Sequence, residues 1–238
     1  MATEAEKLAA ALKALAGAST ADLVAIAPGE AFSEEELGDL GRAFGPVRAV
    51  VVLAQRLVDP VQLLHYRSHD SYQESAVVAS FADAMLRDAC WRAVERLEQA
   101  GYRATIARNL RYADGAPRHH LSFKKAAALA GLGAFGRNQL LIHPEWGPWL
   151  RLRVVVTDAP LPADQPLSFS PCTGCEACLQ VCPVGALSEH GFARPVCEDY
   201  YNLDPDQEGG SARVSERGRH NCDECMRACP VGKAPGGW

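Results

Sequence analysis

The feature that most constrains this chain is a run of four cysteines within residues 172–183, spaced C-x2-C-x2-C-x3-C-P. A second run, within residues 222–230, repeats part of this spacing as C-x2-C-x3-C-P, and Cys197 stands alone between the two runs. Eight of the nine cysteines therefore fall in one short part of the chain. Cysteines at these spacings are typical ligands of iron–sulfur clusters.

The spacing also predicts which cysteines share a cluster. In two-cluster ferredoxins, the first three cysteines of such a run bind one [4Fe–4S] cluster and the fourth binds the other cluster. Three thiolates on a tight loop reach three corners of one cube, whereas the fourth follows a longer gap and points away. We therefore predict a first cluster bound by Cys172, Cys175, Cys178 and Cys229, and a second bound by Cys182, Cys197, Cys222 and Cys225.

Two other uses of cysteine compete with this interpretation. Structural zinc needs two pairs of ligands in a tetrahedron, and a C-x2-C-x2-C triplet leaves one thiolate badly placed for such a site. Disulfides need an oxidising compartment. Residues 1–6 (MATEAE) have neither the basic start nor the apolar middle of an export signal. We therefore favour clusters and expect a reducing, cytoplasmic setting.

Composition sets the broad class of protein. Of the 238 residues, 48% are hydrophobic and 22% are charged, which is ordinary for a globular protein with a sizeable core. The net charge of −5 argues against a nucleic-acid-binding surface, because such surfaces carry a basic excess. The sequence has no run of about 18 apolar residues, so we expect no membrane-spanning segment.

Helix and strand signals alternate through the first part of the chain. Capping-box patterns at Thr3 and Ser33 predict a helix over residues 3–16 and a shorter helix that ends at Gly45. Further helices are predicted at residues 71–100 and 123–130. The apolar stripe of the long helix is expected to contain Val77, Phe81, Met85, Trp91, Val94 and Leu97, and Cys90 is expected in the core. Runs of β-branched residues predict strands at residues 47–54, 102–108, 140–143 and 150–157.

We expect two domains. Strands separated by helices over residues 1–160 predict an α+β domain with the layers of an α/β fold. Residues 158–171 contain four prolines and are expected to form a linker. Residues 161–238 would then form a ferredoxin-like module that holds both clusters.

Residues 131–138 (GLGAFGRN) resemble the A-G-L-G-x-x-G-K-N segment of the epoxyqueuosine reductase family, which in that family precedes a similar set of cysteines. Residues 221–230 resemble that family's second cluster motif, and Cys197 with Tyr200 resembles its isolated cysteine. The resemblance covers about residues 46–233 and extends to the reductive dehalogenases. The glycine segment is not a dinucleotide fingerprint, because no strand leads directly into it.

This resemblance implies a cobalamin-dependent reductase in which two [4Fe–4S] clusters pass single electrons to cobalt. Its N-terminal domain would resemble a flavin-reductase-like fold and hold the corrinoid, and its electrons would come from a donor such as a ferredoxin or flavodoxin. Gly131, Gly133 and Gly136 would let the backbone pass close to the flat macrocycle. Arg137 and Asn138 would bind a phosphate or amide substituent. Alternatively, the glycines form a tight turn and the two polar residues simply lie at that turn.

The chain departs from the family at the proton donor. The family carries an aspartate in a D-x-x-P-x-x-E-R context. Asp114 and Pro117 match the first half of it, but they lie three residues too far from Gly131 and no Glu-Arg follows. Phe123 and Lys124 occupy that place instead. The sequence also lacks the family's C-terminal helical-repeat region, so we expect a small-molecule or corrinoid substrate and not tRNA.

Reductive chemistry also needs a proton source. Asp114, His119 and His120 lie on one predicted loop before the glycine segment and are the candidate catalytic residues. A histidine there could donate a proton near neutral pH. Each of the three could equally be a solvated loop residue.

Three functions fit these observations. The chain could be an oxidoreductase whose clusters reduce cobalamin or a substrate held by the N-terminal domain. It could instead be a non-catalytic electron carrier that serves a partner enzyme, or a protein that reduces and delivers corrinoids for other enzymes.

Overall fold

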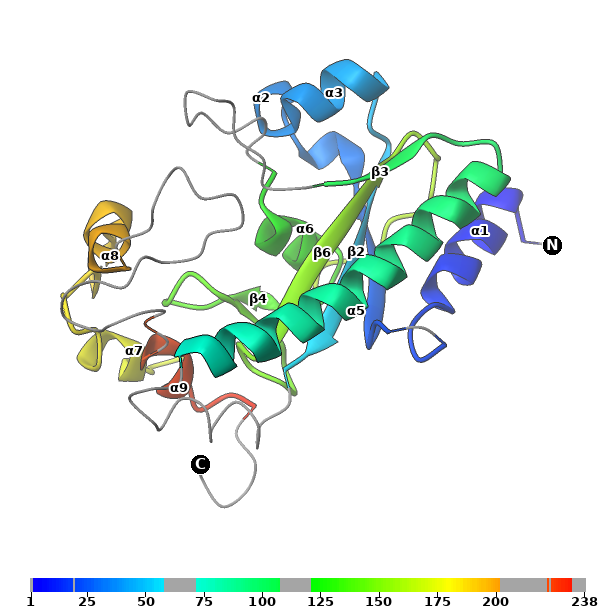
Figure 1. The fold of residues 1–238 in the computed structure, drawn as a ribbon. Coiled ribbons are helices and arrows are strands. Elements are labelled where there is room, and N and C mark those ends of the chain that lie inside the picture. Colours follow the sequence, from blue (N-terminus) through cyan, green and yellow to red (C-terminus); the bar gives the residue numbers. More distant parts are fainter. Residues whose placement is uncertain are drawn as a thin grey trace.

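The computed structural model describes residues 2–18, 20–57, 72–107, 121–201, 222 and 224–232, and for 72–80 and 198–201 it describes the backbone only. A four-stranded sheet forms the centre of the N-terminal part, in the order β1-β2-β6-β3. Its strands are Leu23–Pro28, Ala49–Arg56, Leu150–Thr157 and Ala104–Ile106. All three strand pairs are antiparallel, so this part is a mixed α+β layer structure, as predicted (Figure 1).

Helices cover both faces of the sheet (Figure 1). One core cluster joins α1 (Glu4–Lys13) and α5 (Tyr72–Gln99) to alternate strand residues such as Val51. The other joins α2 (Glu34–Leu37) and α6 (Phe123–Leu129) to the intervening residues, such as Val52. Because both faces are covered, β2 and the second half of β6 are buried on both sides, which explains their nearly continuous apolar runs.

The predicted helix starts are confirmed. The Thr3 hydroxyl accepts the Glu6 N–H at 3.2 Å and starts α1, and Ser33 caps α2 in the same way. Gly38 (φ +47) ends α2 and is followed by α3 (Asp39–Phe44), so the single short helix predicted here is two helices. A 3-10 turn, η1 (Gly29–Ala31), precedes them.

Two fold predictions needed correction. Strand β1 was missed, because its six residues include three of low β-propensity, two alanines and a proline. The stripe predicted for α5 was wrong at Phe81, Met85 and Trp91, which are 64%, 39% and 62% exposed. The helix packs through Ala82, Leu86, Ala89, Cys90, Ala93 and Leu97, which confirms the predictions for Leu97 and Cys90. Small side chains let the helix lie close to the sheet, so the size of an apolar side chain did not predict whether it is buried. The side chain of Val77 lies outside the described residues.

The predicted linker is docked against the sheet. Residues 158–170 form no helix or strand, but Asp164 binds the edge strand β1. The Asp164 N–H donates to the Ile26 carbonyl at 2.8 Å, and its carboxylate accepts the Ile26 N–H at 2.9 Å. Lys13 of α1 forms an ion pair with the same carboxylate. This segment therefore fixes where the cysteine-rich part begins.

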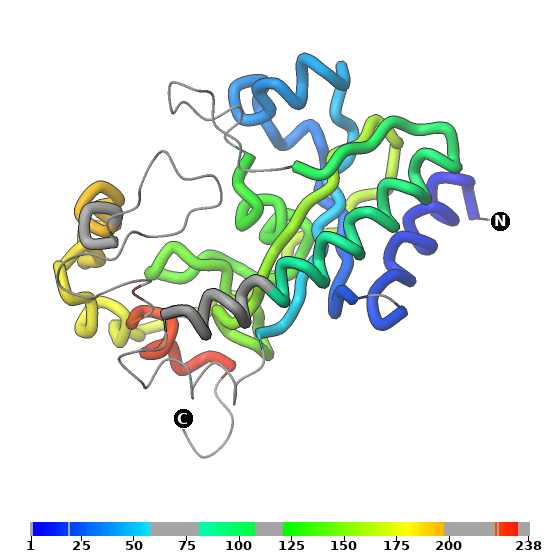
Figure 2. Tube along the Cα trace, viewed as in Figure 1, coloured from blue at the N-terminus to red at the C-terminus, as the bar shows by residue number. Residues whose placement is uncertain are grey.

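Short elements make up the rest of the described chain. A hairpin of β4 (Ala134–Phe135) and β5 (Leu141–Ile142) follows α6. The cysteine-rich part contains α7 (Ala177–Gln180), β7 (Leu187–Ser188), β8 (Gly191–Phe192), α8 (Arg194–Tyr201) and α9 (Glu224–Arg227). Figure 2 shows the green β4-β5 hairpin between the sheet and the yellow and red cysteine-bearing segments. Over the described ranges, no helix combines the length and apolarity needed to cross a membrane.

Candidate iron–sulfur site

Two short helices carry one cysteine of each run at equivalent positions. Cys178 lies in α7 and Cys225 lies in α9, and each is followed four residues later by the sequence Cys-Pro-Val-Gly. The glycine that ends each sequence, Gly185 or Gly232, has positive φ (+64 and +80). Since α7 and α9 pack against each other, the repeat places the two cysteine runs side by side.

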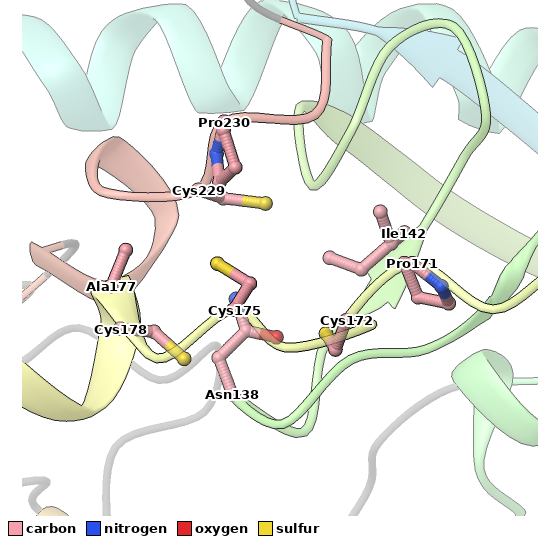
Figure 3. A pocket seen from close by; sticks show the side chains of 9 residues that line it. All are labelled: Asn138, Ile142, Pro171, Cys172, Cys175, Ala177, Cys178, Cys229 and Pro230. Carbon is pink, nitrogen blue, oxygen red and sulfur yellow. The ribbon is translucent and has the colours of Figure 1, made fainter.

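The four cysteines predicted for the first cluster surround one small hollow. It is lined by Cys172, Cys175, Cys178 and Cys229 together with Asn138, Ile142, Pro171, Ala177 and Pro230. Figure 3 shows their sulfur atoms around the space between the segment of Cys172–Cys178 and the segment of Cys229. Within the described ranges, no three His, Cys, Asp or Glu side chains are arranged to hold a single metal ion.

The chemistry of these thiols suits a group that brings its own positive charge. Burial raises the pKa of Cys178, and the neighbouring Cys172, Cys175 and Cys229 raise it further. Metal ligation requires the thiolate form. Four crowded thiolates therefore need positive charge between them, which the iron ions of a [4Fe–4S] core would supply.

The second predicted set lies next to the first. Burial raises the pKa of Cys225 to about 12, and the thiols of Cys222, Cys178, Cys197 and Cys182 add to this rise. Cys225 is thus within electrostatic reach of the three other residues predicted to bind the second cluster. It is also within reach of Cys178 from the first set, so the two sets are neighbours.

The part of the chain built around the four-stranded sheet, within residues 1–160 and called the sheet domain below, touches both sets through the loop between β4 and β5. The backbone N–H of Arg137 donates to the Cys172 Sγ at 3.4 Å. The Asn138 Nδ2 donates to the Cys225 carbonyl at 3.2 Å, and Asn138 is 7% exposed. The Arg137 guanidinium lies 3.5 Å from the Glu176 carboxylate. These contacts bring two residues predicted to bind a corrinoid against the cysteine runs.

The glycines of the same segment are closely packed by the protein. A Cβ on Gly131 would lie 2.4 Å from the Gln165 carbonyl oxygen, and one on Gly133 would lie 2.3 Å from the Ile142 carbonyl oxygen. At Gly136 an added Cβ would meet the Ile142 side chain at 2.8 Å. Packing within the protein therefore leaves no room for a Cβ at any of the three positions. Contact between these glycines and a corrinoid stays a prediction.

Comparison with known proteins shows which proteins this chain resembles. Residues 171–232 match the 4Fe-4S double cluster binding domain. An epoxyqueuosine reductase from Listeria monocytogenes is 35% identical over 115 residues, which is 48% of this chain and 30% of that protein. The chain is a homologue of the epoxyqueuosine reductases.

Solved structures share the fold. The epoxyqueuosine reductase of Streptococcus thermophilus matches with a TM-score of 0.65 at 15% identity, over 96% of this chain and 67% of that chain. A reductive dehalogenase whose structure suggests a mechanism for B12-dependent dehalogenation matches with a TM-score of 0.67 at 22% identity, over 98% of this chain and 32% of that chain. The sequence match covers about a third or less of the length of the first curated epoxyqueuosine reductases it aligns with, 30% and 34%.

Other residues singled out from the sequence have different outcomes. Asp114, His119 and His120 lie outside the described residues, so their catalytic role stays a prediction. Lys124, at the place of the family's Glu-Arg, donates from Nζ to the Gln139 carbonyl at 2.6 Å. Burial lowers its pKa, and the charge of Arg194 lowers it further. No local sequence signal indicates this bond or the contacts of the 136–140 loop with the cysteine runs.

Proposed function

We propose that this chain is an oxidoreductase that carries single electrons through two [4Fe–4S] clusters to an acceptor held by the sheet domain. The observation that carries this proposal is the gathering of four thiols from two distant segments around one hollow. The match of residues 171–232 to a double cluster domain supports the same stoichiometry. Cys172, Cys175, Cys178 and Cys229 would hold one cluster, and Cys182, Cys197, Cys222 and Cys225 the other.

When bound, such clusters accept and donate one electron at a time. The chain's own contribution is to hold the two thiolate sets close together and to shield part of the first set from water. The packing of α7 on α9 holds the two sets together, because these helices carry Cys178 and Cys225. Cys178 and Cys229 are 8% and 9% exposed, and their burial shields this part of the first set from water. A short separation and a fixed geometry favour electron transfer between the sets.

The proposed acceptor is a corrinoid or a substrate reduced through it. The fold match to a reductive dehalogenase with B12-dependent chemistry supports this choice. The sheet domain, which we expect to resemble flavin reductases, would hold the corrinoid. A small-molecule substrate, in place of tRNA, fits the net charge of −5, and a reduced ferredoxin or flavodoxin would supply the electrons. Asp114, His119 and His120 are the proposed proton donors.

Anaerobic reconstitution tests the clusters. We expect about eight iron and eight sulfide ions per chain, and an EPR signal that appears on reduction. Cys229→Ser should remove the first cluster and leave the second detectable. Cys90→Ala is the matched control, because Cys90 is fully buried in the sheet domain and lies outside both runs. Zinc in place of iron in the purified protein would overturn the proposal.

Mixing the reconstituted protein with cob(II)alamin tests the acceptor. A change of the cobalt EPR spectrum to the base-off form would support a corrinoid site, because the axial ligand of cobalt then changes on binding. An unchanged cobalt spectrum beside normal cluster signals would refute the corrinoid and favour an electron carrier for a partner enzyme.

A further inference from the structure

The loop at residues 136–140, between β4 and β5, is the place where the sheet domain touches both cysteine runs. Its Arg137 N–H reaches the Sγ of Cys172 in the first run, and its Asn138 side chain reaches the backbone of Cys225 in the second. The Asn138 side chain also lines the hollow formed by the four thiols (Figure 3). One loop therefore contacts a ligand of each proposed cluster.

The loop is held in one conformation by its own hydrogen bonds. The Gly136 N–H donates to the Leu140 carbonyl at 2.9 Å, and the Gln139 N–H donates to the Gly136 carbonyl at 3.0 Å. The Asn138 Oδ1 accepts the Leu140 N–H at 3.2 Å, so both ends of this amide are used. A polar group with both ends bonded and 7% exposure has few alternative positions.

Backbone strain at Gln139 also indicates that contacts hold this loop in one conformation. Gln139 is the one described non-glycine residue with positive φ, +59. A side chain in this region costs about 1–2 kcal/mol, so the surrounding contacts must hold it there. The Nζ of Lys124 does so by donating to the Gln139 carbonyl at 2.6 Å. A strained conformation held from outside is typical of a functional site.

A hydrogen bond to a cluster sulfur has a defined electrical effect. Reduction adds negative charge to the cluster and its thiolates, and an N–H that points at a thiolate stabilises that charge. Hydrogen bonds to sulfur are therefore one determinant of cluster potential. The Asn138 amide acts one step further away, because it fixes the backbone carbonyl of Cys225 and hence the direction of that thiolate.

We infer that Arg137 and Asn138 are positioning residues for the two clusters: the Arg137 N–H raises the reduction potential of the first cluster, and the Asn138 amide locks the loop to the second. This inference rests on the proposed function, since it requires that both clusters form. It makes the potentials depend on the sheet domain, so an acceptor bound near this loop could alter them. It also gives these two residues a role that needs no corrinoid.

A pulsed EPR experiment tests the Arg137 bond directly. Protein labelled with 15N only at the backbone nitrogen of arginine is reconstituted and reduced without corrinoid. We expect weak coupling between the cluster spin and a 15N nucleus. The coupling should disappear in Arg137→Lys, which keeps the N–H and a cationic side chain but carries unlabelled nitrogen at this position. Cluster signals without any arginine coupling, or coupling that survives Arg137→Lys, would overturn the inference while leaving the proposed function intact.

A redox titration of the same corrinoid-free protein tests Asn138. Asn138→Asp keeps the acceptor for Leu140 but replaces the donor to Cys225 with a negative oxygen. For the second cluster, we expect the ratio of reduced to oxidised form to fall about tenfold at a fixed potential. For one electron this equals a reduction potential lower by about 59 mV. Arg137→Lys should keep the original potential. Identical potentials in Asn138→Asp and the unmodified protein would refute the role of Asn138. If no cluster signal appears in the unmodified protein, the proposed function fails as well.

Discussion

Replacing Gly232 with alanine tests whether a close backbone contact holds the second cysteine run against the sheet domain. Gly232 lies three residues after Cys229 and crosses the turn at Trp146 and Gly147. A Cβ on Gly232 would lie 2.2 Å from the carbonyl carbon of Trp146 and 2.4 Å from the backbone nitrogen of Gly147. Both neighbours are backbone atoms, so neither can move away as a flexible side chain could.

The structure also offers a matched control. Gly185 occupies the equivalent position after the first run, with φ of +64 against +80 for Gly232, but no described atom lies within 4 Å of its added Cβ. Alanine at either position has a conformational cost of about 1–2 kcal/mol. At Gly232 the two backbones must also separate by more than about 1 Å to restore van der Waals contact. We expect this overpacking to add about 1–3 kcal/mol to the loss of stability.

Thermal denaturation and iron analysis of anaerobically reconstituted protein measure both effects. The extra 1–3 kcal/mol corresponds to a Tm lower by roughly 2–12 °C in Gly232→Ala than in Gly185→Ala. Displacement of Cys229 should also lower the occupancy of the first cluster in Gly232→Ala alone. Equal losses of Tm and iron in the two variants would show that the contact does not hold the run, and would refute the reasoning.

Two further predictions concern titratable groups of the sheet domain. The Nδ1 of His143 accepts the N–H groups of Glu145 and Trp146, both at 3.2 Å, and burial lowers its pKa below the usual 6.5. As the pH falls through about 6.5, the unfolded chain therefore takes up a proton that the folded chain resists, and stability falls. His143→Asn keeps the acceptor but does not titrate. Its Tm should therefore fall less than the Tm of the unmodified protein between about pH 7.5 and about pH 5.5. An equal fall of Tm in the two proteins would contradict this. Asp83, with a 14% exposed side chain, bonds Arg151 at 3.0 Å. Burial opposes ionisation, but this arginine and Arg153 outweigh it and hold the pKa of Asp83 below its usual value. Asp83→Asn should cost about 1–3 kcal/mol, measured by urea denaturation at neutral pH, and a loss below about 0.5 kcal/mol would contradict it.

The sequence predicted best where the signal is local. Thr3 and Ser33 marked helix starts correctly, because a capping box needs only four consecutive residues. The cysteine spacing grouped Cys229 with the first run, and the structure places these four side chains around one hollow. Their binding to one cluster stays a prediction. The side chains on α5 were harder, because Phe81 and Trp91 are large and apolar yet exposed, whereas small alanines pack on the sheet.

Contacts between distant segments could not be predicted where no motif links the two segments. The bond between Asn138 and Cys225 and the crossing of Gly147 with Gly232 join residues that are far apart in sequence. Each depends on a register and an approach angle that only the folded chain defines. The glycines at 131–136 illustrate the difficulty: the spacing fits close approach to a cofactor, but equally fits packing against Gln165 and Ile142.

The sheet domain has the means to stay folded without the clusters, whereas the cysteine-rich part depends on them for its stability. Among the described residues, the contacts between the cysteine-rich part and the sheet domain include Asp164 on β1, the loop at 136–140 on Cys172 and Cys225, and Gly232 on the turn at 146–147. The sheet domain has two apolar cores of its own, one on each face. Burial raises the pKa of Cys178 and of Cys225, and the neighbouring thiols add to the rise, so the thiolate forms are disfavoured until positive charge lies between them. For such sites, the free energy of metal binding is largely free energy of folding. Loss of the clusters should thus loosen the cysteine runs first, while the sheet domain keeps its fold.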